Sequence, residues 1–78
     1  YLVLTEKQQS EGRADCIIET QNDVYIFEFK LDGTARQALD QIEAMGYARP
    51  YAADQRNIHR IGVNFSSKTG TIDDWCVK

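Results

Sequence analysis

The 78-residue sequence predicts an α+β (α/β) domain in which a mixed β-sheet carries one main helix, with its elements in the order βββαββ. Three observations predict this class. β-Branched and aromatic residues run through 24–31 and 58–66, a helical apolar repeat fills 35–45, and clusters of turn residues separate these segments. A chain of this length holds one core, so we expect a single domain over residues 1–78.

Two strands are expected ahead of the strongest one. Residues 1–6 are mostly apolar, and residues 13–20 alternate so that Asp15, Ile17 and Glu19 share one face. The polar segment 7–12 separates these strands, and Gly12 there marks a turn or a bulge. Because the sequence begins at Tyr1, directly in an apolar run, we expect it to be a piece of a longer protein.

The strand expected over residues 24–31 places a carboxylate and an ammonium in an apolar run. Alternation puts Glu28 and Lys30 on one face with two aliphatic residues, while the opposite face is entirely apolar. The composition of this run is typical of a strand that is largely covered. Charged groups in such a strand need partners, because burial of an unpaired charge is costly.

The number of residues in the turn at 21–23 decides which side chains of the two strands share a face. A turn of even length brings a third charged residue to the face of Glu28 and Lys30. In a two- or four-residue loop the numbers of opposed residues sum to 43 or 45, and both sums put Asp15 on the face of Glu28 and Lys30. With the sum 43, Asp15 lies directly opposite Glu28. A three-residue loop would instead turn Asp15 to the other face.

A helix is expected over residues 35–45. Thr34 and Gln37 form a capping box at its start, and Gly46 is typical of the residue that ends a helix. Apolar residues recur at helical spacing, which predicts one buried stripe. Gln41 lies at the margin of this stripe, from where its side chain can reach a neighbouring site.

The remaining segments predict a short connection with one helical turn beginning at Pro50, and two further strands, over residues 58–66 and 71–78. In the first of these strands, Ile61, Val63 and Phe65 are expected on the core face. The last strand carries Trp75 and Val77.

Composition narrows the function classes. A net charge of -3 argues against a simple nucleic-acid binder, yet it allows a nuclease, since a bound metal ion offsets the acidic residues that hold it. Cys16 and Cys76 lack the spacing of a zinc site. The sequence has no apolar run long enough to span a membrane and no signal peptide, so we expect a cytoplasmic protein with no membrane partner.

The charged face of the predicted sheet has two interpretations. Asp15 and Glu28 supply the oxygen ligands that Mg²⁺ or Mn²⁺ prefers, and the backbone carbonyl of Phe29 is a candidate third ligand. Lys30 would then hold a water molecule or stabilise charge on a phosphate. Alternatively, Asp15, Glu28 and Lys30 form an ion-paired network on a solvated face, and the residues alone leave both interpretations open.

Four segments in order resemble the PD-(D/E)xK nuclease superfamily, most closely the domain C-terminal to an AAA-ATPase-like region in bacterial proteins. These segments are Gly12-Arg13-Ala14-Asp15, Glu28-Phe29-Lys30, Ala38-Leu39-Asp40-Gln41-Ile42, and Ile61-Gly62-Val63-Asn64-Phe65-Ser66. The resemblance implies a restriction-endonuclease-like core, with Asp15 and Glu28 as metal ligands, Lys30 as the catalytic lysine and Gln41 as an auxiliary residue.

The resemblance also implies a function. It implies a metal-dependent nuclease that cleaves phosphodiester bonds of nucleic acid, most simply DNA, with an upstream ATPase-like region as its partner. The alternative is a catalytically inactive module that uses the same fold for protein or nucleic-acid contact. An exposed first strand would also allow a homodimer through its edge.

Further polar and aromatic residues are expected to have structural roles. The related Gln-x-x-x-Tyr motif is not reproduced, because Tyr47 lies six residues after Gln41, and we expect Tyr47 to be a packing residue. Arg13 is expected to pair with a nearby carboxylate, Glu19 to be solvated and His59 to be structural.

Overall fold

The computed structural model describes residues 3–6, for which only the backbone is considered, and residues 14–78. The elements in chain order are the strands β1 (Val3–Glu6), β2 (Cys16–Glu19) and β3 (Asp23–Leu31), the helix α1 (Ala35–Met45), the 3₁₀ helix η1 (Arg49–Tyr51), and the strands β4 (Asn57–Ser66) and β5 (Thr71–Val77). The α+β class with one main helix is confirmed, and η1, which the order βββαββ leaves out, corresponds to the helical turn predicted at Pro50. Gly12 and Arg13, for which the sequence predicts a turn or bulge and an ion pair, lie outside the described residues.

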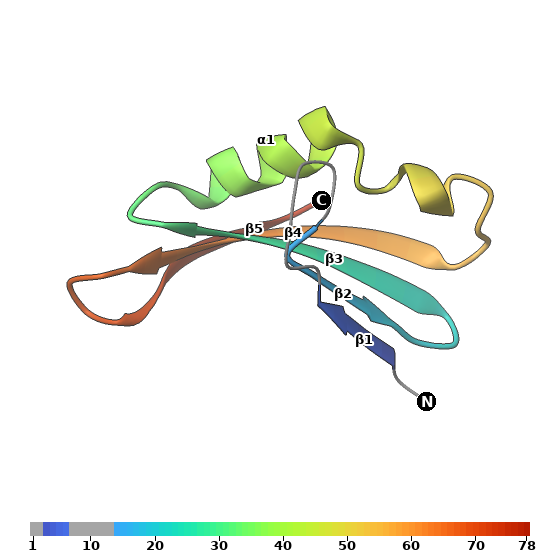
Figure 1. The fold of residues 1–78 in the computed structure, drawn as a ribbon, viewed down its shortest axis with the longest axis horizontal. Coiled ribbons are helices and arrows are strands. Elements are labelled where there is room, and N and C mark those ends of the chain that lie inside the picture. The colour runs from blue at the N-terminus through green and yellow to red at the C-terminus, as the bar shows by residue number, and fades with distance from the viewer. Residues whose placement is uncertain (1–2, 7–13) are drawn as a thin grey trace.

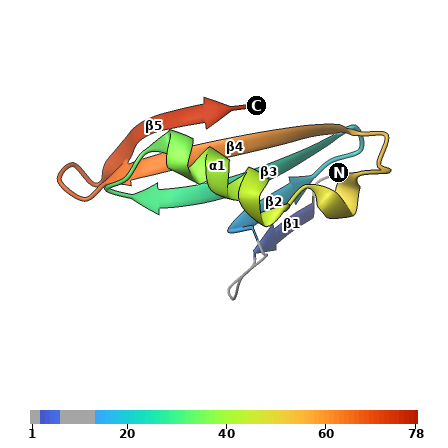
Figure 2. The same ribbon diagram turned by 90° about the horizontal axis from the view of Figure 1, so that it is seen from above.

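The strands form one mixed sheet whose spatial order is the chain order, β1-β2-β3-β4-β5. The central pair, β3 and β4, is parallel because α1 carries the chain back across the sheet between them, and the other pairs are antiparallel. Helix α1 lies on one face of this sheet, above β3 and β4 (Figures 1 and 2). Within the described ranges, no helix is both long and apolar enough to cross a membrane.

Strand β1 lies at one edge of the described sheet. Dimerisation through this edge stays a prediction. We expect the apparent mass in gel filtration to rise with protein concentration if two β1 edges pair. A monomer at all concentrations would contradict it.

The hairpin between β2 and β3 has the register with the sum 43. Cys16 pairs with Phe27 and Glu19 with Val24, while the Thr20 amide donates to the Asp23 carbonyl at 2.8 Å across a two-residue turn. Of the two sums that the sequence left open, the structure shows 43, and the predicted two-residue loop is confirmed. One step beyond the Cys16–Phe27 pair, the same register sets Asp15 opposite Glu28.

Helix α1 begins and ends as its sequence predicts. The Thr34 hydroxyl accepts from the Gln37 amide at 3.0 Å, and the Gln37 side chain accepts from the Thr34 amide at 2.9 Å. At the other end, Gly46 has φ 67°, which a residue without a Cβ adopts at low cost. The buried face of the helix is formed by Ala35, Ala38, Leu39 and Ile42.

Removal of the capping box should destabilise the domain measurably. We expect Thr34→Ala to lower the free energy of unfolding by about 1 kcal/mol, because the Gln37 amide loses its acceptor. Urea unfolding followed by circular dichroism measures the loss. Thr69→Ala is the control, since it also removes a hydroxyl that accepts from a backbone amide, that of Thr71 at 3.3 Å, but in an exposed turn outside the helix. An equal loss in both variants would contradict a special role for the cap.

The face of β4 that packs under α1 differs from the predicted one. Glu28 pairs with Gly62 and Lys30 with Asn64, so the even-numbered residues of β4 face the helix. The prediction that Ile61, Val63 and Phe65 lie on the core face is therefore wrong for the core beneath α1, although Val63 is buried on the opposite face of the sheet. The physical reason is space, because a Cβ at position 62 would collide with the Ala35 carbonyl and lie 2.7 Å from the Leu39 amide nitrogen.

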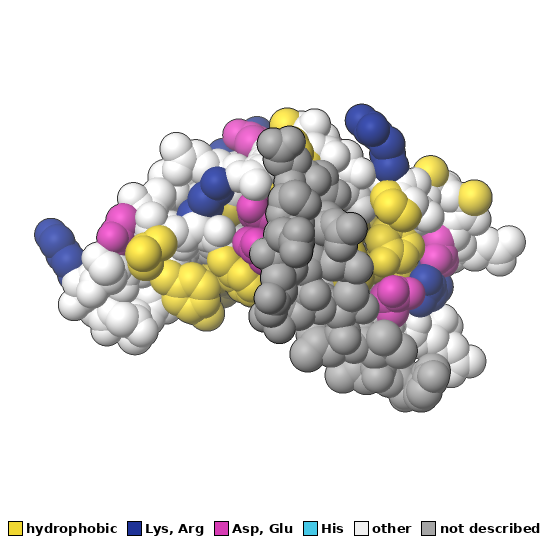
Figure 3. Space-filling view, in the orientation of Figure 1, with side chains coloured by type: hydrophobic (Ala, Val, Ile, Leu, Met, Phe, Trp, Pro, Cys, Tyr) yellow, Lys and Arg dark blue, Asp and Glu magenta, His cyan; other side chains and the backbone are white. Residues whose placement is uncertain are grey.

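The other face of the sheet, which we call the open face, is only partly covered by the residues that the structure describes. In β3, Val24, Ile26 and Glu28 are buried beneath α1, whereas the opposite side of the strand is only partly covered, so the expectation of a largely covered strand holds for one face. Figure 3 shows apolar side chains on the side of the sheet away from α1. The exposed large apolar residues of β3 and β5 are Phe29, Leu31, Ile72, Trp75 and Val77.

Polar contacts attach the segment after η1 to the β2–β3 hairpin. Arg56 pairs with Asp54 at 2.6 Å and with Glu19 at 3.0 Å, and the Tyr51 hydroxyl donates to Glu19 at 3.3 Å. The bond to Arg56 lowers the pKa of Asp54 to about 2. Glu19 is thus an ion-paired residue, and the expectation of a solvated carboxylate is wrong.

Candidate active site

Asp15 is held just before β2, where that strand begins beside β3. Its Oδ2 accepts from the Phe29 amide at 2.8 Å, which fixes the carboxylate beside β3, just beyond the last residue pair of the β2–β3 ladder. The N–H and C=O groups of one strand residue point to the same side. The Phe29 carbonyl oxygen therefore lies on the Asp15 side of β3, as a metal ligand at that position would require.

Glu28 is a buried carboxylate with an unsatisfied oxygen. The residue is only 4% exposed, and its Oε1 has no hydrogen-bond partner among the described residues. Burial in the first place, and then the negative charge of Asp15, raise the pKa of Glu28 to about 7, while Lys30 opposes this shift. Such an oxygen is costly to bury, so its presence indicates that a proton or a cation belongs beside it.

The donor set fits a magnesium ion. Asp15 and Glu28 offer carboxylate oxygens and Phe29 offers a carbonyl oxygen, all of them hard ligands of the kind that Mg²⁺ and Mn²⁺ prefer. The described part of the chain contains no group of three or more His, Cys, Asp or Glu residues suited to a metal ion. Two carboxylates are nevertheless sufficient for Mg²⁺, which commonly keeps several water ligands and binds substrate phosphates.

Lys30 and Gln41 meet across the space between β3 and α1. The Lys30 Nζ donates to the Gln41 Oε1 at 2.5 Å. The structure thus brings the four side chains proposed from the sequence, Asp15, Glu28, Lys30 and Gln41, to the helix-covered side of β3. Their chemical roles stay predictions.

Tyr47 extends this group, and the sequence interpretation missed its contact. The Gln41 Nε2 donates to the Tyr47 hydroxyl oxygen at 3.3 Å, and Tyr47 is only 5% exposed. The left-handed Gly46 reverses the chain so that the Tyr47 amide donates to the Ile42 carbonyl at 3.2 Å. Gly46 followed by an aromatic residue was the available sequence signal, because a helix-ending glycine turns the next side chain back toward the helix.

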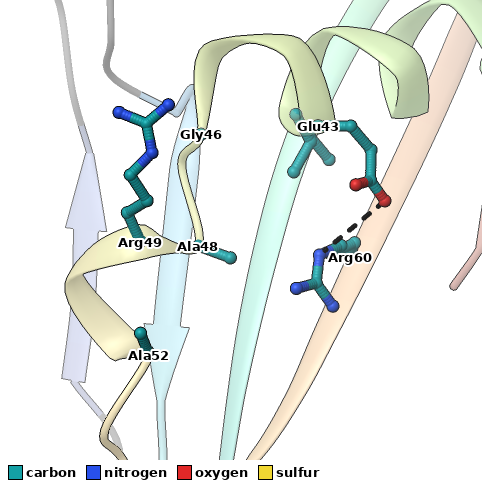
Figure 4. A pocket seen from close by; sticks show the side chains of 7 residues that line it. Glu43, Gly46, Ala48, Arg49, Ala52 and Arg60 are labelled. Atoms are coloured by element: carbon teal, nitrogen blue, oxygen red, sulfur yellow. Dashed lines mark ion pairs between the residues drawn. The ribbon is translucent and has the colours of Figure 1, made fainter.

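A separate pocket of about 310 Å³ lies at the C-terminal end of α1. Figure 4 shows Arg49 on one side of Ala48, and Arg60 on the other side beneath Glu43. The Glu43 carboxylate pairs with Lys78 at 2.9 Å and lies 3.9 Å from the Arg60 guanidinium. None of the four site residues lines this pocket, so we assign it no part in the site.

The mixed sheet with one helix is compatible with a restriction-endonuclease-like fold. The chain belongs to the PD-(D/E)XK nuclease superfamily, whose sequence profile matches residues 1–75. It is 37% identical over 78 residues to an "Uncharacterized protein in vnfD 5'region" of Azotobacter chroococcum mcd 1. That match covers 97% of this chain and 15% of the relative, so the chain spans a small part of the relative's length. No solved structure matches the chain.

Proposed function

We propose that this domain hydrolyses phosphodiester bonds of nucleic acid, most simply DNA, with the help of Mg²⁺ or Mn²⁺ held by Asp15, Glu28 and the Phe29 carbonyl. The observation that carries the proposal is the Glu28 Oε1, which is buried near a second carboxylate and has no hydrogen-bond partner in the described part of the chain. The superfamily assignment supports it, because PD-(D/E)XK nucleases generally use divalent metals.

The side chains have distinct parts in this reaction. The bound cation would lower the pKa of a water molecule and offset negative charge on the scissile phosphate. Lys30, held by Gln41, places a positive charge beside the two carboxylates, where it can orient the attacking water and stabilise the charge that develops on phosphate oxygens. Glu28 must lose its proton before it can bind the cation.

Metal binding tests the first half of the proposal. In isothermal titration with Mn²⁺, we expect wild-type protein to bind one ion, and Glu28→Gln to bind it at least roughly tenfold more weakly, because it lacks a charged ligand. Glu43→Gln is the matched control, because Glu43 lies on α1 and pairs with Lys78 instead of facing Asp15. Absence of heat in the wild-type protein would leave the proposal without its cofactor.

Cleavage tests the second half. With linear and single-stranded DNA and Mg²⁺, we expect Lys30→Ala in the full-length protein to lower the rate by about 100-fold, the usual effect of removing one charge-stabilising group. Lys68→Ala, in an exposed turn, should cleave at the wild-type rate. Equal cleavage by Lys30→Ala and the wild-type protein would remove Lys30 from the mechanism.

A second candidate function is a catalytically inactive module that contacts an ATPase-like region of the same polypeptide. The open sheet face favours it, because exposed apolar patches of this kind mark interaction sites, and Trp75 is 67% exposed there. The matched segment forms 15% of the curated relative, so most of that protein lies outside it. If this is the function, Trp75→Ser should weaken the contact in the full-length protein. Neither the wild-type protein nor Trp75→Ser should then bind Mn²⁺.

A further inference from the structure

We propose that Tyr47 is a positioning residue that orients the Gln41 side-chain amide and thereby fixes the Lys30 ammonium. The proposal rests on the proposed function only where it concerns cleavage. Its structural basis is the continuous series of contacts from Tyr47 through Gln41 to Lys30, which joins the core to the candidate catalytic lysine.

The chemistry of the three groups allows only one orientation of the amide. An ammonium can only donate hydrogen bonds, so the atom of Gln41 that meets Lys30 must be the oxygen. The Nε2 group must then point to the other side, where the Tyr47 hydroxyl oxygen accepts from it at 3.3 Å. If the Gln41 amide were rotated by 180°, its NH₂ group would face the Lys30 ammonium, and two hydrogen-bond donors would then meet.

Tyr47 is rigid enough to act as the fixed end of this series. Its ring belongs to the buried core, together with Ile17, Ile26 and Ile42. Its backbone is fastened to α1 by the bond from its amide to the Ile42 carbonyl. Gln41, in contrast, is only partly buried and has several rotatable bonds, so its amide needs a partner to hold one orientation.

The position of the Lys30 ammonium matters because two carboxylates compete for it. Lys30 lies on the same face of β3 as Glu28, and Asp15 faces Glu28 across the hairpin. An ammonium released from Gln41 would be attracted toward these carboxylates and would compete with a divalent cation. The Tyr47 hydroxyl thus keeps the positive charge of Lys30 at the edge of the candidate metal site.

The experiment compares Tyr47→Phe with Tyr51→Phe. Both changes delete one tyrosine hydroxyl, but the Tyr51 hydroxyl donates to Glu19, within the ion-paired group around Arg56. We expect only Tyr47→Phe to shift and broaden the ¹H–¹⁵N signals of the Gln41 amide and the Lys30 ammonium in the metal-free protein. In the full-length protein, we expect it to lower kcat by about tenfold and to change KM less than about twofold.

A second substitution separates orientation from packing. In Gln41→Leu no amide is left to connect the Tyr47 hydroxyl with Lys30, while the side chain stays large. We therefore expect Tyr47→Phe, added to Gln41→Leu, to leave the Lys30 signal of the single variant unchanged. An equal shift in both backgrounds, or unchanged Gln41 and Lys30 signals in Tyr47→Phe alone, would overturn the proposal. Because the NMR signals are read without substrate, a wild-type protein that fails to cleave DNA would overturn the proposed function and leave this test standing.

Discussion

In the absence of divalent cations, the free energy of unfolding should fall by roughly 2 to 3 kcal/mol as the pH rises from 5 to 8. The pKa of Glu28 is about 7 in the folded domain, against the ordinary value of 4.5 expected in the unfolded chain. The folded state therefore binds the proton more tightly, and the stability that this supplies below pH 4.5 is lost as the pH rises through 7. Urea unfolding at several pH values measures this slope.

Glu28→Gln provides the comparison. An amide carries no charge at any pH, so we expect the stability of this variant to stay nearly constant over the same range and to exceed that of the wild-type protein at pH 8. Mg²⁺ or Mn²⁺ should restore the wild-type stability at pH 8 and leave the variant unchanged, because bound ligand stabilises only the state that binds it. Glu43→Gln should keep the wild-type slope, since the Lys78 contact lowers the pKa of Glu43 and moves its titration below this range.

An unchanged slope in Glu28→Gln would show that another group causes the pH dependence. Asp54 is not a competing explanation, because its pKa of about 2 confines its effect to strongly acidic solution. Loss of the slope without any effect of metal would indicate a buried carboxylic acid that has only a structural role.

The arrangement of the candidate site was predictable where it depends on strand alternation and a short turn. A strand has a side-chain period of two, so Glu28 and Lys30 had to share a face. The tight turn after Thr20 then determined that Asp15 joined them, because a shift of one residue would have moved the whole strand to the other face. These relations involve neighbours in sequence and need no knowledge of the packed structure.

Which residues of β4 face the helix depends on tertiary packing. The apolar residues of this strand are concentrated at Ile61, Val63 and Phe65, so hydrophobicity alone favoured that face as the core. The helix, however, requires a surface that it can approach closely, and Gly62 supplies it. Close approach of a helix to one glycine leaves no periodic signal in the sequence.

The contact between Tyr47 and Gln41 was only partly predictable: Gly46 followed by an aromatic residue indicates a side chain turned back toward the helix, but not which helix residue it meets. Their separation of six residues matches no helical spacing. The contact exists because Gly46 reverses the chain and the Tyr47 ring then enters the core, which brings its hydroxyl back to the helix margin. A side chain that reaches across a turn in this way depends on the packed rotamer as well as on the sequence.

Helix α1 packs directly against Gly62 of β4. We therefore expect Gly62→Ala, which adds a single methyl group, to have a large effect on stability. In Gly62→Ala the new Cβ would meet the Ala35 carbonyl, the Leu39 amide nitrogen and the Ala38 Cβ, the last at 3.1 Å. Because the first two are backbone atoms, the helix must move away as a unit. We expect a loss of about 3 kcal/mol in the free energy of unfolding, at the upper end of the usual effect of overpacking.

Gly70→Ala is the control for Gly62→Ala, because the two glycines are needed for different reasons. Gly70 has open space around its Cβ position but a φ of 71°, so its replacement should cost only about 1 kcal/mol of backbone strain. Movement of α1 would also carry Gln41 away from Lys30, so Gly62→Ala should shift the Gln41 amide signals and Gly70→Ala should not. Equal losses of stability in the two variants, with unchanged Gln41 signals, would contradict close seating of the helix on β4. Gly62 therefore links the fold to the candidate site, because the distance between α1 and the sheet determines whether the helix glutamine reaches the strand lysine.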